Sequence, residues 1–192
     1  MKKLLLMLVL LSSMFLFASC NKNVEKVTII LTDGREIRLE LYPDIAPQSV
    51  ANFLKLVDEK HYDGVIFHRV IEGFMIQTGS YYINNGRPVQ KPSVPSIFGE
   101  FASNGFNNPL KHKAGVISMA RTNVYNSGSD QFFICSDTTP SLDGEYAAFG
   151  KVRDRKSLKV VKEISKVETR EYSEELADLP QKMITIKTII RG

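Results

Sequence analysis

Alternation of apolar and polar positions with a period of two recurs along the chain and predicts a mainly β protein. Two such segments, 24–31 and 35–41, flank a Thr-Asp-Gly turn and predict an antiparallel hairpin. Short apolar segments between turn signals predict further strands, at 65–70, 74–78, 97–101, 115–119, 132–135, 147–151 and 183–190.

Two segments have helical spacing instead. After Pro47, which suits a first helical position, apolar residues at i, i+3, i+4 and i+7 predict a helix over 47–59: Val50, Phe53, Leu54 and Val57. A second helix is predicted from the spacing of Leu158, Val161, Ile164 and Val167.

About eight short strands and two helices predict a single domain, in the form of a closed eight-stranded antiparallel barrel capped by the two α-helices. Closure is expected because it removes unpaired sheet edges. Two segments are predicted to lie outside this barrel. The first, 168–182, is polar and acid-rich and is expected to be an exposed excursion. The second is a loop that follows an Asn-Gly turn at 85–86 and has two prolines within 91–96.

The N-terminus has the pattern of an export signal. Lys2 and Lys3 precede an apolar run at 4–17, which is short for a membrane span, and then Ala-Ser-Cys. This resembles a bacterial lipoprotein signal, although the usual leucine three places before Cys20 is a phenylalanine. A signal over 1–19, an acylated Cys20 with a tether over 20–26, and a domain over 27–192 are therefore expected. The protein would be lipid-anchored in the cell envelope, on the periplasmic side of a membrane or at the cell surface; a plain secreted or uncleaved form is the alternative.

Charge and metal-binding patterns exclude some functions. The formal net charge is +4, of which the two lysines of the signal supply two, so there is no reason to expect nucleic acid as a partner. The three histidines lack the close spacing of a metal site, so no metal is predicted. Cys135 has no neighbouring cysteine and is expected to be a small buried core residue.

A charged side chain within an apolar segment predicts a pocket. Arg69 stands in FHRVIEGFMIQ, and an unpaired buried arginine is costly, so Arg69 is expected to line a cleft. Period-two alternation puts Met75 with Gln77 on one strand, and Gln131 with Phe133 on another. An apolar pocket with a few placed polar groups is typical of a ligand site.

Four motifs resemble the cyclophilins, the cyclosporin-binding class of peptidyl-prolyl cis-trans isomerases. They are FHRVIEGFMIQTG from Phe67, LKHKAGVISMA from Leu110, GSDQFFI from Gly128 and LDGEYAAFGKV from Leu142. The resemblance covers about 27–190. It implies an isomerase that accelerates rotation about X–Pro bonds in exported proteins and assists their folding. Its partners would be proline-containing polypeptides of the cell envelope, and it would need no cofactor and act as a monomer.

The resemblance also implies the site. The family's catalytic arginine falls on Arg69, with Gln77 beside it to steady it. The implied substrate-binding residues are Phe74, Met75, Gly86, Ala120, Arg121, Thr122, Gln131, Phe133, Leu142 and Tyr146. Two positions depart from the best-known members, which have Trp at Ser141 and His at Tyr146, and the position of Arg121 is often Asn in the family.

Isomerisation of an X–Pro bond needs no nucleophile. The obstacle to rotation is the partial double bond of the amide, with a barrier of about 18–20 kcal/mol. Arg69 could donate to the nitrogen lone pair that reappears when the amide twists. Two other functions are kept as alternatives. One is a chaperone or scaffold that binds proline-containing segments with little turnover. The other is a sugar- or lipid-binding barrel, which is disfavoured because the chain has no tryptophan.

Overall fold

The computed structural model describes residues 23–192. The predicted signal at 1–19 and the acylated Cys20 lie outside the described residues. Within the described part, no helix combines the length and hydrophobicity needed to cross a membrane.

The main sheet is antiparallel and has eight strands, which confirms the mainly β class. Its first strands form the predicted hairpin, and the apolar members of their alternation, such as Val27 and Ile29, are fully buried. In spatial order the strands are β12 (Ile186–Arg191), β1 (Glu25–Leu31), β2 (Glu36–Leu41), β9 (Ala148–Val152), β7 (Val116–Met119), β8 (Phe132–Cys135), β4 (Met75–Thr78) and β3 (Arg69–Ile71).

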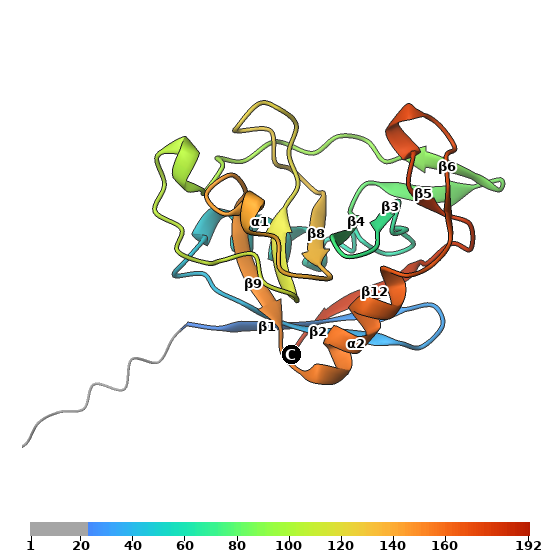
Figure 1. Cartoon of the computed structure of the whole chain (residues 1–192), viewed down its shortest axis with the longest axis horizontal. Coiled ribbons are helices and arrows are strands. Elements are labelled where there is room, and N and C mark those ends of the chain that lie inside the picture. Colours follow the sequence, from blue (N-terminus) through green and yellow to red (C-terminus); the bar gives the residue numbers. More distant parts are fainter. Residues whose placement is uncertain (1–22) are drawn as a thin grey trace, which may run out of the picture.

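The predicted closed barrel is wrong: the sheet curls strongly but stays an open half-barrel (Figure 1). Its edge strands β3 and β12 share no ladder. Near the gap between them lies the predicted 65–70 strand, which is irregular before Arg69. There Ile66 forms one isolated bridge to Thr185, while its N–H donates to Tyr81 on the other side. This pairing with the chain before β12 ends after one bridge, so no continuous ladder closes the barrel.

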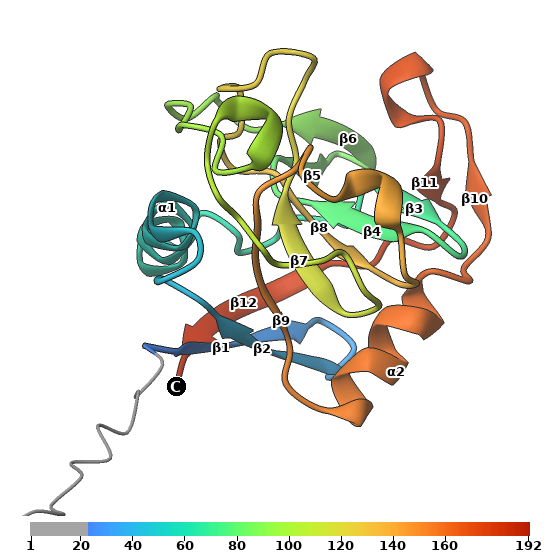
Figure 2. The ribbon, with the colours of Figure 1, turned by 60° about the vertical axis from the view of Figure 1, so that its left-hand side comes forward.

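The two predicted helices are confirmed and lie on different sides of the molecule (Figure 2). The first, α1 (Pro47–Asp58), buries the predicted apolar stripe. The second, α2 (Arg155–Ile164), ends before Val167. It begins at Asp154, whose carboxylate accepts the backbone N–H of Ser157 at 2.8 Å and so satisfies one of the free N–H groups at the helix start.

The predicted strand at 97–101 is absent, because this segment is held by side chains rather than by a ladder. The buried Glu100 carboxylate accepts the backbone N–H groups of Gln48 and Ser49 at 2.9 and 2.8 Å. These N–H groups belong to the first turn of α1, where an anion is favourable. The segment therefore fixes the start of a helix instead of extending the sheet.

A small separate sheet includes the predicted Asn-Gly turn and the first part of the loop predicted to follow it. It pairs β5 (Tyr81–Asn84) with β6 (Arg87–Gln90) around the predicted Asn-Gly turn. Asn85 and Gly86 have φ of 49° and 75°, as a two-residue hairpin turn requires. Its strands are mostly half-buried or exposed, and β6 contains a proline. These strands therefore lack the apolar alternation from which a strand is predicted.

The acid-rich excursion is only partly exposed. Two short strands, β10 (Thr169–Arg170) and β11 (Leu179–Pro180), pair at its base. Leu176 and Leu179 are buried against Ile66, so the excursion is docked beside β3 (Figure 2).

Candidate active site

Three adjacent strands bring the predicted polar and apolar side chains together. In the register of β3, β4 and β8, Arg69 lies opposite Gln77, and Gln77 lies opposite Phe133. Directly opposed residues in an antiparallel sheet point to the same face. The alternation that predicted one shared surface is therefore confirmed.

These residues line a hollow of about 200 Å³, here called the arginine pocket. Nine of the predicted site residues form its wall: Arg69, Phe74, Met75, Gln77, Ala120, Arg121, Phe133, Leu142 and Tyr146. Thr122 and Gln131 instead line an adjoining hollow of about 240 Å³, which shares Gln77, Ala120 and Arg121 with the first. Gly86 lies in the β5–β6 turn and lines neither hollow.

The floor of the arginine pocket is an apolar cluster of its own. Met75, Phe133 and Leu142 are buried there with Cys135, apart from the main core. Tyr146 packs edge-on against Phe133, with ring centroids 5.7 Å apart. Burial raises the pKa of the Cys135 thiol to about 12, so this thiol is inert and structural, as predicted. The floor can accept a small apolar ring.

Arg69 stands half-exposed at the rim of this floor. Its Nε–H donates to Asp178 Oδ2 at 3.2 Å, across 109 residues of sequence. No carboxylate lies on β3 itself, and this one comes from the 168–182 excursion instead. Gln77 lies beside Arg69, but its amide donates to Gln131 Oε1 at 2.8 Å. Asp178 was missed, and the only signal for it was the acidic character of its segment.

Arg121 separates the two hollows. Its guanidinium carbon lies over the rings of Phe101, Tyr125 and Tyr146, at 5.1, 5.1 and 4.6 Å from their centroids. Its Nε–H donates to the carbonyl of Glu145 at 2.9 Å. An arginine held by cation–π contacts and a backbone acceptor serves as a fixed wall.

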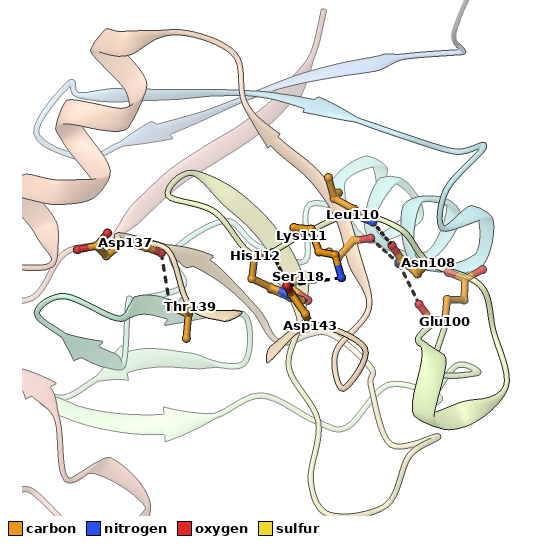
Figure 3. Close-up of polar contacts among 10 residues, drawn as sticks. Glu100, Asn108, Leu110, Lys111, His112, Ser118, Asp137, Thr139 and Asp143 are labelled. Atoms are coloured by element: carbon orange, nitrogen blue, oxygen red, sulfur yellow. Dashed lines mark hydrogen bonds and ion pairs between the residues drawn. The ribbon is translucent and has the colours of Figure 1, made fainter. Parts of the chain in front are cut away.

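A hydrogen-bonded chain, Asp143–His112–Ser118, lies under the pocket floor, with the histidine and serine buried and the aspartate partly exposed (Figure 3). His112 Nδ1 is 3.1 Å from Asp143 Oδ1, and its Nε2 is 3.1 Å from Ser118 Oγ. The ring stacks on Phe133. Although these residue types match a hydrolase triad, the serine is fully buried and cannot meet a substrate. The chain therefore supports the floor.

Burial decides the charge of the histidine in this chain. Desolvation lowers the pKa of His112 and outweighs the opposing effect of Asp143. Burial also acts to raise the pKa of Asp143, but the hydrogen bonds from the His112 backbone and ring outweigh it and leave this pKa below its usual value. The pair is therefore a neutral imidazole donating to a carboxylate at neutral pH.

Comparison with known proteins agrees with this geometry. The chain is 42% identical over 137 residues to a peptidyl-prolyl cis-trans isomerase of Synechococcus elongatus, covering 71% of this chain and 86% of that protein. It is 42% identical over 124 residues to peptidyl-prolyl cis-trans isomerase B of Bacillus subtilis, covering 64% and 80%.

Solved structures show the same fold. A Cryptosporidium parvum cyclophilin-type isomerase superposes with a TM-score of 0.70 at 27% identity, covering 88% of this chain and 98% of that one. A second structure of that protein, determined in the presence of the dipeptide Ala-Pro, gives 0.69 at 29% identity, covering 87% and 98%. The family model described as cyclophilin type peptidyl-prolyl cis-trans isomerase/CLD matches residues 26–190. Since that match spans most of the chain, the protein belongs to the cyclophilin-type peptidyl-prolyl cis-trans isomerases, an enzyme class that the arginine pocket fits.

Proposed function

We propose that Arg69 lowers the barrier to X–Pro rotation while the proline ring lies on the floor of the arginine pocket. The supporting observation is a permanent cation at the rim of an apolar hollow. Resonance leaves no lone pair on the nitrogen of a planar amide, and twisting restores it. Arg69 can then donate to the nitrogen or hold the neighbouring carbonyl. The twisted amide presents both its nitrogen and the neighbouring carbonyl to the guanidinium, whereas the planar amide presents only the carbonyl. The interaction with Arg69 is therefore stronger in the transition state, and it raises turnover more than it tightens substrate binding.

The other residues of the site bind and align the peptide. Phe74, Met75, Phe133 and Leu142 would hold the proline ring, because they form the apolar floor and its rim. Gln77 would hydrogen-bond the flanking backbone. Ala120, Arg121, Thr122 and Gln131, which line the adjoining hollow, would align the residues next to the proline. A substrate contact by Gly86 stays a prediction.

Substitution of Arg69 tests this role. Arg69→Ala should reduce turnover by about 10²–10³-fold, the range for loss of one transition-state donor, while affinity for the peptide falls much less. Both quantities can be measured on one proline-containing peptide, by exchange NMR for turnover and by titration for affinity. Unchanged turnover in the variant would refute the role of Arg69.

The same exchange assay on the wild-type protein distinguishes an isomerase from a chaperone or scaffold. A chaperone or scaffold would bind the peptide and leave its cis–trans exchange rate at the uncatalysed value. The isomerase must raise that rate at substoichiometric concentration. Phe133→Ala is the matched variant for binding, because it removes a wall of the floor and should weaken affinity as well as turnover.

We also propose that the protein acts on exported polypeptides while anchored in a bacterial cell envelope through acylated Cys20. The supporting features are the two N-terminal lysines, the apolar run at 4–17 and the position of the cysteine. Cys20→Ala should move the full chain from the detergent phase to the aqueous phase on fractionation. Wild-type protein found in the aqueous phase would contradict the anchor and leave the isomerase activity unaffected.

A further inference from the structure

Asp178 is fixed beside β3 by its backbone and by its neighbours. Its carbonyl accepts the backbone N–H of Val70 at 3.0 Å, in the residue next to Arg69. Leu176 and Leu179, on either side of it, are buried in a cluster with Ile66. The excursion therefore delivers one carboxylate to a defined place, and that place does not depend on the aspartate side chain.

This carboxylate meets Arg69 on the side away from the arginine pocket. Asp178 lines a separate hollow with Val70 and Ile71, whereas Arg69 lines the pocket itself. The Nε–H of Arg69 donates to Asp178 Oδ2 at 3.2 Å. A guanidinium has five N–H donors in one plane, so engagement of Nε fixes that plane and leaves the four Nη donors for a substrate.

The contact is better suited to orientation than to stability. The two side chains are 42% and 34% exposed, and an ion pair with this exposure adds little to folding. Gln77, the cross-strand neighbour of Arg69, is engaged with Gln131. Among residues 23–192, Asp178 is thus the hydrogen-bond partner of the Arg69 side chain. We propose that Asp178 is a positioning residue, which holds the Arg69 guanidinium for catalysis; the inference rests on the catalytic role proposed for Arg69.

Three single substitutions in the full chain test this. Asp178→Ala should lower turnover of a proline-containing peptide by roughly 10-fold and leave its dissociation constant within about 2-fold, since misplacement of a catalytic group by about 1 Å can cost 100-fold. Asp178→Asn keeps an acceptor oxygen at the same reach and should recover most of the turnover. Glu174→Ala, an exposed acidic residue of the same excursion, is the matched control and should behave as wild type.

A double substitution separates positioning from other effects. If Asp178 acts through Arg69, Asp178→Ala should have no further effect on turnover in an Arg69→Ala background. Thermal unfolding should be nearly unchanged in Asp178→Ala, because the backbone bond to Val70 and the buried leucines remain.

Each other outcome overturns the inference. Unchanged or faster turnover in Asp178→Ala, with Arg69→Ala inactive, would show that Arg69 is catalytic without positioning by Asp178. An equal loss in both backgrounds would show that Asp178 acts independently of Arg69. Full turnover in Arg69→Ala would instead remove the proposed role of Arg69 itself.

Discussion

Two sides of the same pocket pair a basic side chain with an aspartate at nearly the same distance. At the rim, Arg69 Nε lies 3.2 Å from Asp178, and under the floor, His112 Nδ1 lies 3.1 Å from Asp143. Their surroundings differ. The Arg69 side chain is 42% exposed, whereas the His112 side chain is fully buried. At the rim, the permanently charged Arg69 is accessible to a substrate. Under the floor, the neutral ring of His112 is not accessible to a substrate.

Burial therefore decides what each pair contributes. An exposed ion pair contributes about 0–1 kcal/mol to stability, so removal of the rim pair should change activity and spare the fold. A buried donor left without its acceptor costs about 1–3 kcal/mol, so disruption of the floor pair should change stability first. Substitutions on the two sides should accordingly give opposite patterns of turnover and stability.

The largest effect is expected from a substitution that keeps the charge at the rim. Arg69→Lys retains a cation but lacks the planar fork that engages Asp178 and a substrate together. Its turnover should fall close to that of Arg69→Ala, by about 10²–10³-fold or about 3–4 kcal/mol in the barrier. Exchange NMR on one peptide measures this, with thermal unfolding as the control for folding. If the lysine variant keeps near wild-type turnover, charge alone suffices and the orientation argument fails.

Lowering the pH of the wild-type protein should reduce its stability through the buried histidines and leave the turnover that depends on Arg69 unchanged. His68, the buried residue directly before Arg69, has its pKa lowered by burial to about 4, and desolvation also lowers the pKa of His112. The unfolded chain takes up protons near pH 6.5 and the folded chain only at lower pH, so stability falls as pH falls. His68 alone should account for a loss of about 3 kcal/mol between pH 7 and pH 4.

Denaturant unfolding at several pH values checks the loss of stability, and turnover is measured wherever the protein remains folded. Arginine does not titrate in this range, so turnover of the folded protein should stay level. A drop in turnover with a midpoint near an imidazole pKa, in protein that is still folded, would mean that a histidine takes part in catalysis.

Much of the fold and pocket could be predicted because the governing patterns are local. Strict alternation of apolar and polar residues predicted the 24–41 hairpin, and apolar residues spaced three and four apart predicted α1. The same alternation put Met75 with Gln77 and Gln131 with Phe133, and the register of β3, β4 and β8 then places Gln77 and Phe133 on one face with Arg69.

The remaining features depend on contacts that no local pattern carries. The sheet stays open because the 65–67 segment pairs with residues 184–186, far away in sequence, through one isolated bridge only. The contact of Asp178 with Arg69 requires the excursion to dock through Leu176 and Leu179, and these two leucines lie in a segment that is polar overall. A polar segment is predicted to be exposed when its few apolar residues do not recur with the period of a helix or a strand.

On the floor side, loss of the carboxylate should reduce stability with little change in chemistry. Asp143 Oδ1 accepts both the backbone N–H and the ring of His112, at 2.7 and 3.1 Å. Asp143→Ala leaves two donors without this acceptor and should lower the free energy of unfolding by about 2 kcal/mol. Denaturant unfolding measures this, and turnover per folded molecule should stay within about 2-fold. A large loss of turnover in fully folded protein would place the floor pair in the catalytic machinery.

The smallest effect tests which ring nitrogen of His112 carries the proton. Because Nδ1 faces a carboxylate, which can only accept, Nδ1 must be the protonated atom, and Nε2 then accepts from the hydroxyl of Ser118. Ser118→Ala removes one donor and leaves both bonds to Asp143, so it should cost about 1 kcal/mol, or half the loss in Asp143→Ala.

Nitrogen-15 NMR of the wild-type ring checks the tautomer directly, and unfolding of the two variants checks the ratio of their losses. An equal loss in both, or a proton on Nε2, would mean that the hydroxyl accepts rather than donates. If Nδ1 had lost its proton, the carboxyl of Asp143 would have to carry one in order to donate to Nδ1, and if Nδ1 had kept it, the ring would be an imidazolium. The first arrangement is opposed by the lowered pKa of Asp143, whose ionised form the two hydrogen bonds from His112 stabilise, and the second by the desolvation that lowers the pKa of His112.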